Sequence, residues 1–181
     1  MIYTTKELIN AGETEYSIRN KLKEGSLFLV ERGLYSTEPK PFFKNEVYIS
    51  KKYPSAVITG LSAFFLYDLT DHIPDYYYLA TENHSFPIRK DDVKQSYQDK
   101  SFFEIGVINE QFDDGFVRTY DLERLLIELF RLKEKYPREI YYEVIASFRN
   151  VKDKIDFYKL NQYLKHFTNG NNLLQKIKEV I

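Results

Sequence analysis

Apolar and polar residues near the start of the chain predict two short helices. Thr5 is placed to cap a helix over Lys6–Asn10, which a glycine then ends. A second helix begins at about Thr14 and ends at the next glycine, with Ile18 and Leu22 four residues apart on its inner face. The helices are joined by a tight turn.

Two apolar stretches follow these helices and predict a β-hairpin. Leu27–Val30 and Leu34-Tyr35 flank a turn at Arg32-Gly33. A short helix, a tight turn, a second helix and a hairpin form the outline of a winged helix-turn-helix. We therefore predict a DNA-binding domain of this kind over residues 1–36.

The middle of the chain alternates apolar runs with turn residues, which predicts a small mixed sheet. A proline-containing break leads to a connecting helix, expected from about Phe43 to Lys52 within residues 37–53. The further expected elements are strands at Ala56–Thr59, Tyr76–Thr81, Phe102–Ile108 and Phe116–Tyr120, a helix at Leu61–Leu69 and a turn at Asp113-Asp114-Gly115.

The apolar period changes to that of a helix after Asp121, which is placed to cap the first of several helices. Its apolar stripe consists of Leu122, Leu125, Leu126, Leu129 and Leu132. Further helices are expected at Glu139–Phe148, at Phe157–Phe167 with Asn169-Gly170 as its stop, and at Leu173–Ile181. We predict an α/β (α+β) fold whose C-terminal domain, residues 54–181, has a small sheet over 54–120 and a helical group over 121–181.

Composition places the chain among ordered globular proteins. Its 181 residues are 43% hydrophobic and 29% charged, enough for one domain or two small ones. The chain has no cysteine, which excludes disulfides and thiolate chemistry and suits a reducing cytoplasm. No apolar leader or membrane-length apolar run is present, so we expect a cytoplasmic protein with no membrane partner.

Charge is distributed unevenly along the chain although the net charge is −1. Residues 68–123 contain 13 Asp and Glu against 5 Lys and Arg, a balance of −8. Residues 138–181 contain 8 basic and 5 acidic residues, a balance of +3. A nucleic acid should therefore meet the two ends of the chain and avoid its middle.

The predicted second helix supplies the candidate DNA-binding residues. In a helix-turn-helix this helix enters the major groove, where Asn pairs with adenine and Arg with guanine or a phosphate. An ordinary solvated helix face is the alternative, because residues 1–36 carry five basic and five acidic side chains. Lys152, Lys154, Lys159 and Lys165 are candidates for a second phosphate-facing patch. The candidate DNA-binding residues are Thr14, Tyr16, Ser17, Arg19, Asn20, Lys23 and, at the tip of the wing, Arg32.

The acidic stretch from Thr59 to Asp75 raises the question of an active site. A nucleotidyltransferase needs a Gly-Ser turn followed by an Asp-x-Asp pair that shares metal ions. Here Gly60 and Ser62 are separated by a leucine, and Asp68 and Asp71 are three residues apart. We interpret the stretch as a core helix followed by a polar turn, and we assign no catalytic residue.

A metal-dependent nuclease is an alternative hypothesis. Asp75, Glu82 and His84 would supply the metal ligands, with Glu82 and His84 two apart on one face of a strand. The lysine that usually accompanies such ligands is absent. His72, His84 and His166 lack metal-like spacing, so we predict neither a metal ion nor a cofactor.

Several stretches together resemble the AbiEi antitoxin family of bacterial abortive-infection and toxin–antitoxin systems. The N-terminal stretches TTKELINAG, KEGSL and ERGLYS are similar to that family's winged helix-turn-helix, and GLSAFFLYDLTDHIPD is similar to the start of its second domain. The stretch VRTYDLERLLIELFR is similar to another recurrent block of the family, with matches at Arg118, Tyr120, Asp121, Glu123 and Arg124.

The resemblance implies a DNA-binding antitoxin, without enzymatic activity, that represses its own operon and takes part in phage defence. Its DNA partner would be its own promoter, at inverted repeats. Its second domain would neutralise a nucleotidyltransferase-type toxin without needing a stable complex. Arg118, Asp121 and Arg124 would then be a functional cluster, although a helix cap with nearby ion pairs is the favoured interpretation. A stand-alone winged-helix transcriptional regulator is the alternative.

Overall fold

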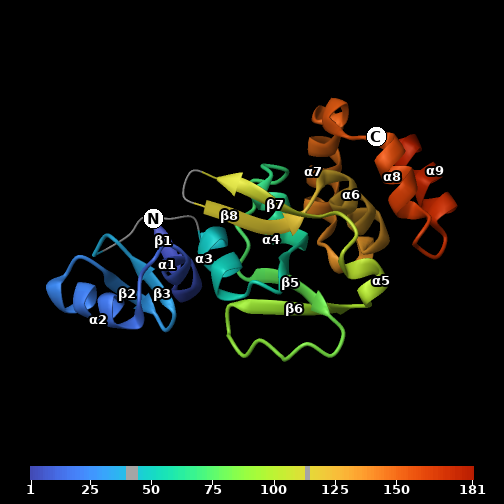
Figure 1. Cartoon of the computed structure of the whole chain (residues 1–181). Coiled ribbons are helices and arrows are strands. Elements are labelled where there is room, and N and C mark those ends of the chain that lie inside the picture. The colour runs from blue at the N-terminus through green and yellow to red at the C-terminus, as the bar shows by residue number, and fades with distance from the viewer. Residues whose placement is uncertain (40–44, 113–114) are drawn as a thin grey trace. The chain divides into compact units, whose positions relative to one another are not determined.

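A computed structural model describes residues 1–39, 45–112 and 115–181 (Figure 1). The chain forms two compact units. Unit 1 comprises Met1–Pro54 and Asn109–Val117, and unit 2 comprises Ser55–Ile108 and Arg118–Ile181. Helices and mixed sheets together confirm the expected α/β class.

Unit 1 contains two short helices and a hairpin in the expected order, together with a strand that the pattern did not predict. Within Met1–Pro54 the elements are β1 (Ile2–Thr4), α1 (Thr5–Asn10), α2 (Glu15–Glu24), β2 (Phe28–Glu31), β3 (Leu34–Ser36) and a third helix, α3 (Asn45–Lys52). β3 pairs with β1 on one side and β2 on the other, both antiparallel. The identity of this arrangement as a winged helix-turn-helix stays a prediction.

The core of unit 1 includes α3, which the sequence had placed in a connecting segment. Val47 and Ile49 of α3 are buried, as are Ile2 of β1, Ile18 of α2 and Leu34 of β3. A Cβ added to Gly115 would lie 2.8 Å from Val47, because this stretch of unit 1 packs closely on α3. The first compact unit therefore extends beyond residue 36 to Pro54. Residues 43 and 44 of the expected connecting helix lie outside the described residues.

Thr4, and not Thr5 as expected, caps α1. The Thr4 backbone is extended, its hydroxyl accepts from the Glu7 N–H at 3.1 Å, and its own N–H donates to the Glu7 carboxylate at 2.6 Å. This reciprocal pair is a capping box. The Thr5 N–H donates instead to the Gly33 carbonyl at 3.0 Å, so Thr5 belongs to the helix and ties it to the hairpin turn.

The larger sheet has five strands in the order β6-β5-β4-β8-β7. β4 pairs antiparallel with β5 and parallel with β8, while β5 and β6 run parallel. The sheet elements and associated short helices are β4 (Val57–Ile58), α4 (Gly60–Leu66), β5 (Tyr77–Glu82), β6 (Val93–Gln98), α5 (Lys100–Phe103), β7 (Val107–Phe112) and β8 (Gly115–Tyr120).

The C-terminal part of unit 2 is helical, as expected. Leu125, Leu126 and Leu129 of the predicted stripe are fully buried, and so is Ile127. Asp121 caps the first helix by accepting from the Arg124 N–H at 2.8 Å, which confirms the predicted cap. The helices are α6 (Leu122–Arg131), α7 (Arg138–Asn150), α8 (Phe157–Leu164) and α9 (Gly170–Val180), with 3-10 turns at Lys133–Lys135 and Lys152–Lys154.

Two predicted elements of unit 2 are wrong. The expected strand at Phe102–Ile108 is divided, because α5 ends at Phe103 and β7 begins only at Val107, after a left-handed Gly106. Asn169-Gly170 does not simply stop a helix: left-handed Asn169 precedes α9, which begins at Gly170. A Cβ at Gly170 would lie 2.0 Å from the Leu164 carbonyl oxygen, so the close approach requires glycine. The expected turn at 113–115 falls mostly outside the described residues.

Helices within residues 1–39, 45–112 and 115–181 are all too short or too polar to cross a membrane.

Candidate nucleic-acid interface

Helix α2 presents three of its predicted DNA-contacting side chains to solvent. Tyr16 is 75% exposed, and Lys23 is also exposed. The side chain of Arg19 is 74% exposed and lies 3.7 Å from the Glu15 carboxylate one turn away. Such exposed pairs contribute little free energy, so Arg19 can exchange Glu15 for another anion at small cost.

The other predicted residues of α2 have structural roles or are less accessible. The Thr14 hydroxyl accepts from the Ser17 N–H at 3.1 Å, and the Ser17 hydroxyl accepts from the Thr14 N–H at 2.8 Å. Ser17 also donates to Glu13, which pairs with Lys21. Asn20 is half-buried. The structure therefore separates Tyr16, Arg19 and Lys23 from the residues that fix the start of the helix.

The hairpin turn that carries Arg32 is anchored at two points. The Gly33 carbonyl accepts the Thr5 N–H, and the Glu31 carboxylate pairs with Lys52 of α3 at 2.6 Å. Gly33 has a φ of 83°, which suits the turn because glycine adopts left-handed backbone without strain. Arg32 itself is exposed. The contacts from α1 and α3 thus hold the neighbours of Arg32 in the turn.

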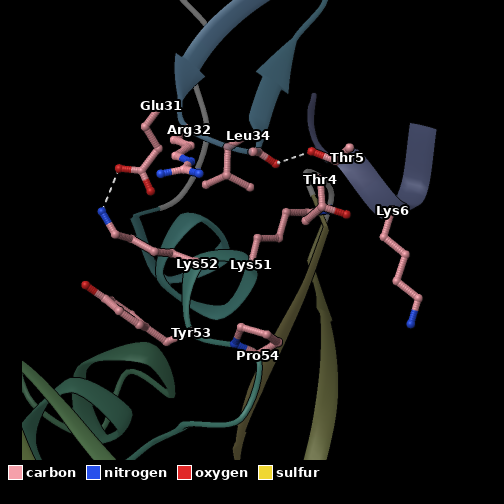
Figure 2. A pocket seen from close by; sticks show the side chains of 11 residues that line it. Thr4, Thr5, Lys6, Glu31, Arg32, Leu34, Lys51, Lys52, Tyr53 and Pro54 are labelled. Atoms are coloured by element: carbon pink, nitrogen blue, oxygen red, sulfur yellow. Dashed lines mark hydrogen bonds and ion pairs between the residues drawn. The ribbon is translucent and has the colours of Figure 1, made fainter. Parts of the chain in front are cut away.

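A hollow of about 610 Å³ lies beside this turn, entirely within unit 1 (Figure 2). We call it the turn pocket. Cationic side chains from three separated parts of the chain line it, together with hydroxyl and apolar groups. The residues that line it are Thr4, Thr5, Lys6, Glu31, Arg32, Gly33, Leu34, Lys51, Lys52, Tyr53 and Pro54.

Two cations of the turn pocket are paired. Lys51 contacts Glu7 at 2.6 Å, and Lys52 contacts both Glu31 and the Tyr48 hydroxyl, at 2.6 and 2.9 Å. Partial burial opposes the charged forms, but hydrogen bonds to the partner groups dominate, lowering the pKa of Glu7 and raising that of Lys52. These groups therefore remain charged at neutral pH.

Lys6 and Arg32 supply two further positive charges to the turn pocket. Neither makes an ion pair or a side-chain hydrogen bond within the described ranges. The sequence pattern indicated Arg32 as a DNA-binding residue but neither Lys6 nor the two lysines of α3. The adjacent Lys51-Lys52 pair at the end of a helix was a visible signal, but only the fold brings it beside the turn.

Asp121 and Arg124 belong to a buried polar network of unit 2. Arg124 is fully buried, and its guanidinium donates to Glu128, to Gln98 and to the carbonyl oxygens of Phe102 and Ile105. These bonds use its whole donor fork. Gly106 lies against it, since an added Cβ would be 2.5 Å from the Arg124 Cβ. This network has the character of a structural core.

Glu128 accepts additional hydrogen bonds in the same network. The Thr59 hydroxyl donates to it at 2.6 Å and the Gln98 amide at 3.1 Å. The Arg124 guanidinium also lies over the Tyr120 ring, at 4.6 Å from its centroid. Arg118 pairs with Glu104 at 3.3 Å, nearer the surface. The cap at Asp121 and the ion pairs of Arg118 and Arg124 agree with the favoured interpretation of these residues as a helix cap with nearby ion pairs.

A second group of contacts links Asp121 to α8. The Asp121 carboxylate accepts from the Tyr163 hydroxyl at 2.8 Å and pairs with Lys159 at 2.9 Å. Glu123 also accepts from Lys159, at 3.1 Å, and from the Asp156 N–H at 2.8 Å. Lys159, one of the candidate phosphate-facing lysines, is thus engaged with two carboxylates.

Tyr163 should report on this arrangement in an alkaline titration. Burial, followed by the hydrogen bond to Asp121, raises the pKa of Tyr163 to about 12. Asp121→Asn keeps a capping side chain but removes the negative charge, so we expect the Tyr163 pKa to fall partway toward 10.

The raised pKa of Tyr163 also makes stability depend on pH. Because the phenol ionises at a lower pH in the unfolded chain than in the folded one, Tyr163 should stabilise the fold fully below about pH 10 and progressively less toward pH 12. Tyrosine-ring NMR, with Tyr163→Phe to assign the signal, measures the pKa; an unchanged value in Asp121→Asn would contradict the role of Asp121.

The nuclease hypothesis gains no support from the geometry. β5 ends at Glu82, and His84 lies beyond the strand with a φ of 68°, so the expected shared strand face is wrong. Asp75 is exposed ahead of the same strand. Among the residues that the structure describes, no group of three or more His, Asp or Glu side chains is arranged to hold a metal ion.

Ser62, of the Gly60-Leu61-Ser62 stretch, has a structural role. Its hydroxyl donates to the Tyr76 carbonyl at 3.1 Å and accepts from the Tyr78 N–H at 2.9 Å. Ser62 and Phe64 are buried, in agreement with the interpretation of this stretch as part of the core.

No protein-family model matches this chain, and no curated protein sequence matches it. The similarity to AbiEi antitoxins therefore rests on the stretches quoted above.

Proposed function

We propose that this chain is a DNA-binding antitoxin. Unit 1 recognises DNA upstream of its own gene through α2 and represses transcription. Unit 2 neutralises a nucleotidyltransferase-type toxin and is not itself an enzyme. The resemblance to AbiEi antitoxins supports the toxin partner, and the surface of α2 supports DNA binding.

The observation that carries the DNA-binding part is the spacing of the exposed side chains on α2. Tyr16, Arg19 and Lys23 follow one another at intervals of three and four residues, which places them on one face of the helix. Ile18 is buried on the opposite side. A face that combines a guanidinium, an ammonium and a phenol can contact base edges and phosphates together.

Two features make α2 suited to recognition as a rigid element. Its first turn is fixed by the reciprocal Thr14–Ser17 bonds, and its end is fixed by left-handed Gly25, whose N–H donates to the Lys21 carbonyl. The capping residues are not those of the exposed face, so Tyr16, Arg19 and Lys23 remain available to a ligand. The acidic Glu15 on the same helix favours a specific approach over generic attraction to polyanions, because it repels a phosphate placed near it.

Replacing both exposed cations of α2 should weaken DNA binding. We expect Arg19→Ala/Lys23→Ala to bind DNA from upstream of the gene about 10-fold to 30-fold more weakly, because one base or phosphate contact and one phosphate contact are lost. Fluorescence anisotropy across a salt series measures the affinity, with scrambled DNA for comparison. Lys176→Ala/Lys178→Ala, on exposed positions of α9, removes the same charge as a control.

The control should retain both affinity and sequence preference. An Arg19→Ala/Lys23→Ala protein with native affinity for the upstream DNA would refute recognition through α2. Equal binding of upstream and scrambled DNA by the native protein would refute promoter recognition.

A further inference from the structure

We propose that the turn pocket of unit 1 binds a phosphate group of a nucleic-acid backbone. This extends the proposed DNA surface, on which it rests, to α3 and to the start of α1. The sequence had placed α3 outside the DNA-binding domain. Figure 2 shows side chains of both helices and of the hairpin turn that line the pocket, with the Lys6 side chain extending away from those of Arg32, Lys51 and Lys52.

Charge is the first argument for an anionic ligand. Lys6, Arg32, Lys51 and Lys52 line the pocket against one lining carboxylate, that of Glu31. Glu7 pairs with Lys51 from outside the lining set, so a net positive charge remains after both carboxylates are counted. The excess of positive over negative charge at the pocket favours an entering anion.

Preorganisation is the second argument. Glu31 and Tyr48 hold the Lys52 ammonium, Glu7 holds Lys51, and the Thr5–Gly33 hydrogen bond holds the turn. The anchoring carboxylates restrict the two lysines, which lowers the entropy that a ligand must remove when it binds. Lys6 and Arg32 are then the cations with open donor groups, among the residues described.

The chemistry of these donors selects phosphate. The planar guanidinium of Arg32 matches two phosphate oxygens in a bidentate contact, and the Lys6 ammonium adds a point charge. Both side chains are exposed, so the ligand can remain largely in solvent. A phosphate of a nucleic-acid backbone fits such an exposed site, because the phosphate can bind there while the sugars on either side of it remain in solvent.

Lys6→Gln/Arg32→Gln tests the proposal with little risk to folding, since neither side chain has a partner in the described part of the chain. In the full-length protein, inorganic phosphate should shift the amide resonances of Thr5 and Gly33, and the variant should lose these shifts. For a duplex from upstream of the gene, the variant should bind about tenfold more weakly at low salt. The slope of log affinity against log salt should fall by about two, one for each lost contact. Lys176→Gln/Lys178→Gln provides the charge-matched control.

The outcomes separate this proposal from the proposed function. If Lys6→Gln/Arg32→Gln keeps the native phosphate-induced shifts and the native salt slope, the proposal that the turn pocket binds phosphate is refuted. An equal loss of duplex affinity in the control variant would refute it as well. Phosphate shifts that vanish in the variant while duplex affinity is unchanged would identify a site for free phosphate and overturn the backbone contact. If the duplex binds without sequence preference, is indifferent to Arg19 and Lys23, and still depends on Lys6 and Arg32, the pocket stands and promoter recognition fails.

Discussion

Arg124→Ala should lower the free energy of unfolding of unit 2 by about 3–5 kcal/mol, because it leaves a buried carboxylate without its cation. Arg124 and Glu128 have side-chain exposures of 0% and 2%. After the substitution Glu128 would keep the Thr59 and Gln98 hydrogen bonds but lose its charge partner. The carbonyl groups of Phe102 and Ile105 would lose their donor as well.

Urea unfolding followed by circular dichroism measures this loss. Arg118→Ala is the comparison, since the pair of Arg118 with Glu104 is partly exposed, and it should cost less than Arg124→Ala. Arg124→Met/Glu128→Leu should recover part of the stability lost in Arg124→Ala, because it removes both charges but leaves the Thr59 hydroxyl and the carbonyl groups of Phe102 and Ile105 without these partners. A loss below about 1 kcal/mol in Arg124→Ala would show that water or rearranged neighbours satisfy Glu128.

The helical group of unit 2 was predictable because local chemistry and burial agree there. The leucine stripe after Asp121 has the helical period, and an aspartate is a strong capping residue. The burial of the charged residues of α6 was less apparent from the sequence. Glu123, Arg124 and Glu128 interrupt the stripe with charges, yet all three are buried, because long-range contacts with residues such as Gln98 and Lys159 compensate for them.

The strands that the pattern missed lack a distinctive apolar signal. β1 has three residues, of which Ile2 is buried. β6 has the sequence VKQSYQ and lies at the edge of the five-stranded sheet, where its side chains are not buried. Its place follows from a parallel register with β5 along the whole strand, which is a tertiary property. Hydrophobic alternation cannot indicate such a strand.

The candidate interface was predictable in part. The second helix, its start at Thr14 and its exposed Tyr16 and Arg19 follow from local pattern. Thr14 and Ser17 could also have been recognised as capping residues, since a pair three apart at a helix start forms a capping box. The turn pocket could not have been predicted, because contacts such as Lys51–Glu7 and Lys52–Glu31 join residues 44 and 21 positions apart.

Unit 1 cannot be removed cleanly by truncation, which determines how the two proposed activities should be separated. Deleting residues 1–36 would remove β1 and the hairpin but leave α3, whose Val47 and Ile49 are buried in the intact unit. Residues 109–117 also belong to unit 1 although they lie far along the chain. Point substitutions at exposed positions of α2 avoid exposing this core.

Arg19→Ala/Lys23→Ala should therefore abolish most repression and leave toxin neutralisation intact. We expect a reporter under the upstream promoter to lose at least about tenfold repression, following the loss of α2 contacts to DNA. Growth of cells that express a nucleotidyltransferase-type toxin from a neighbouring gene should be rescued as fully as by the native chain. The Arg124→Ala variant should fail to rescue growth when the cells are kept at a temperature at which its unit 2 is unfolded.

These measurements distinguish the antitoxin from a stand-alone regulator because the two activities depend on different residues. Rescue by the α2 variant together with loss of rescue in Arg124→Ala assigns neutralisation to unit 2. Loss of both repression and rescue in a folded α2 variant would overturn this division. If the native chain represses the promoter but rescues no cells from the toxin, the antitoxin proposal fails, and the fold would then serve a transcriptional regulator whose second unit has another role.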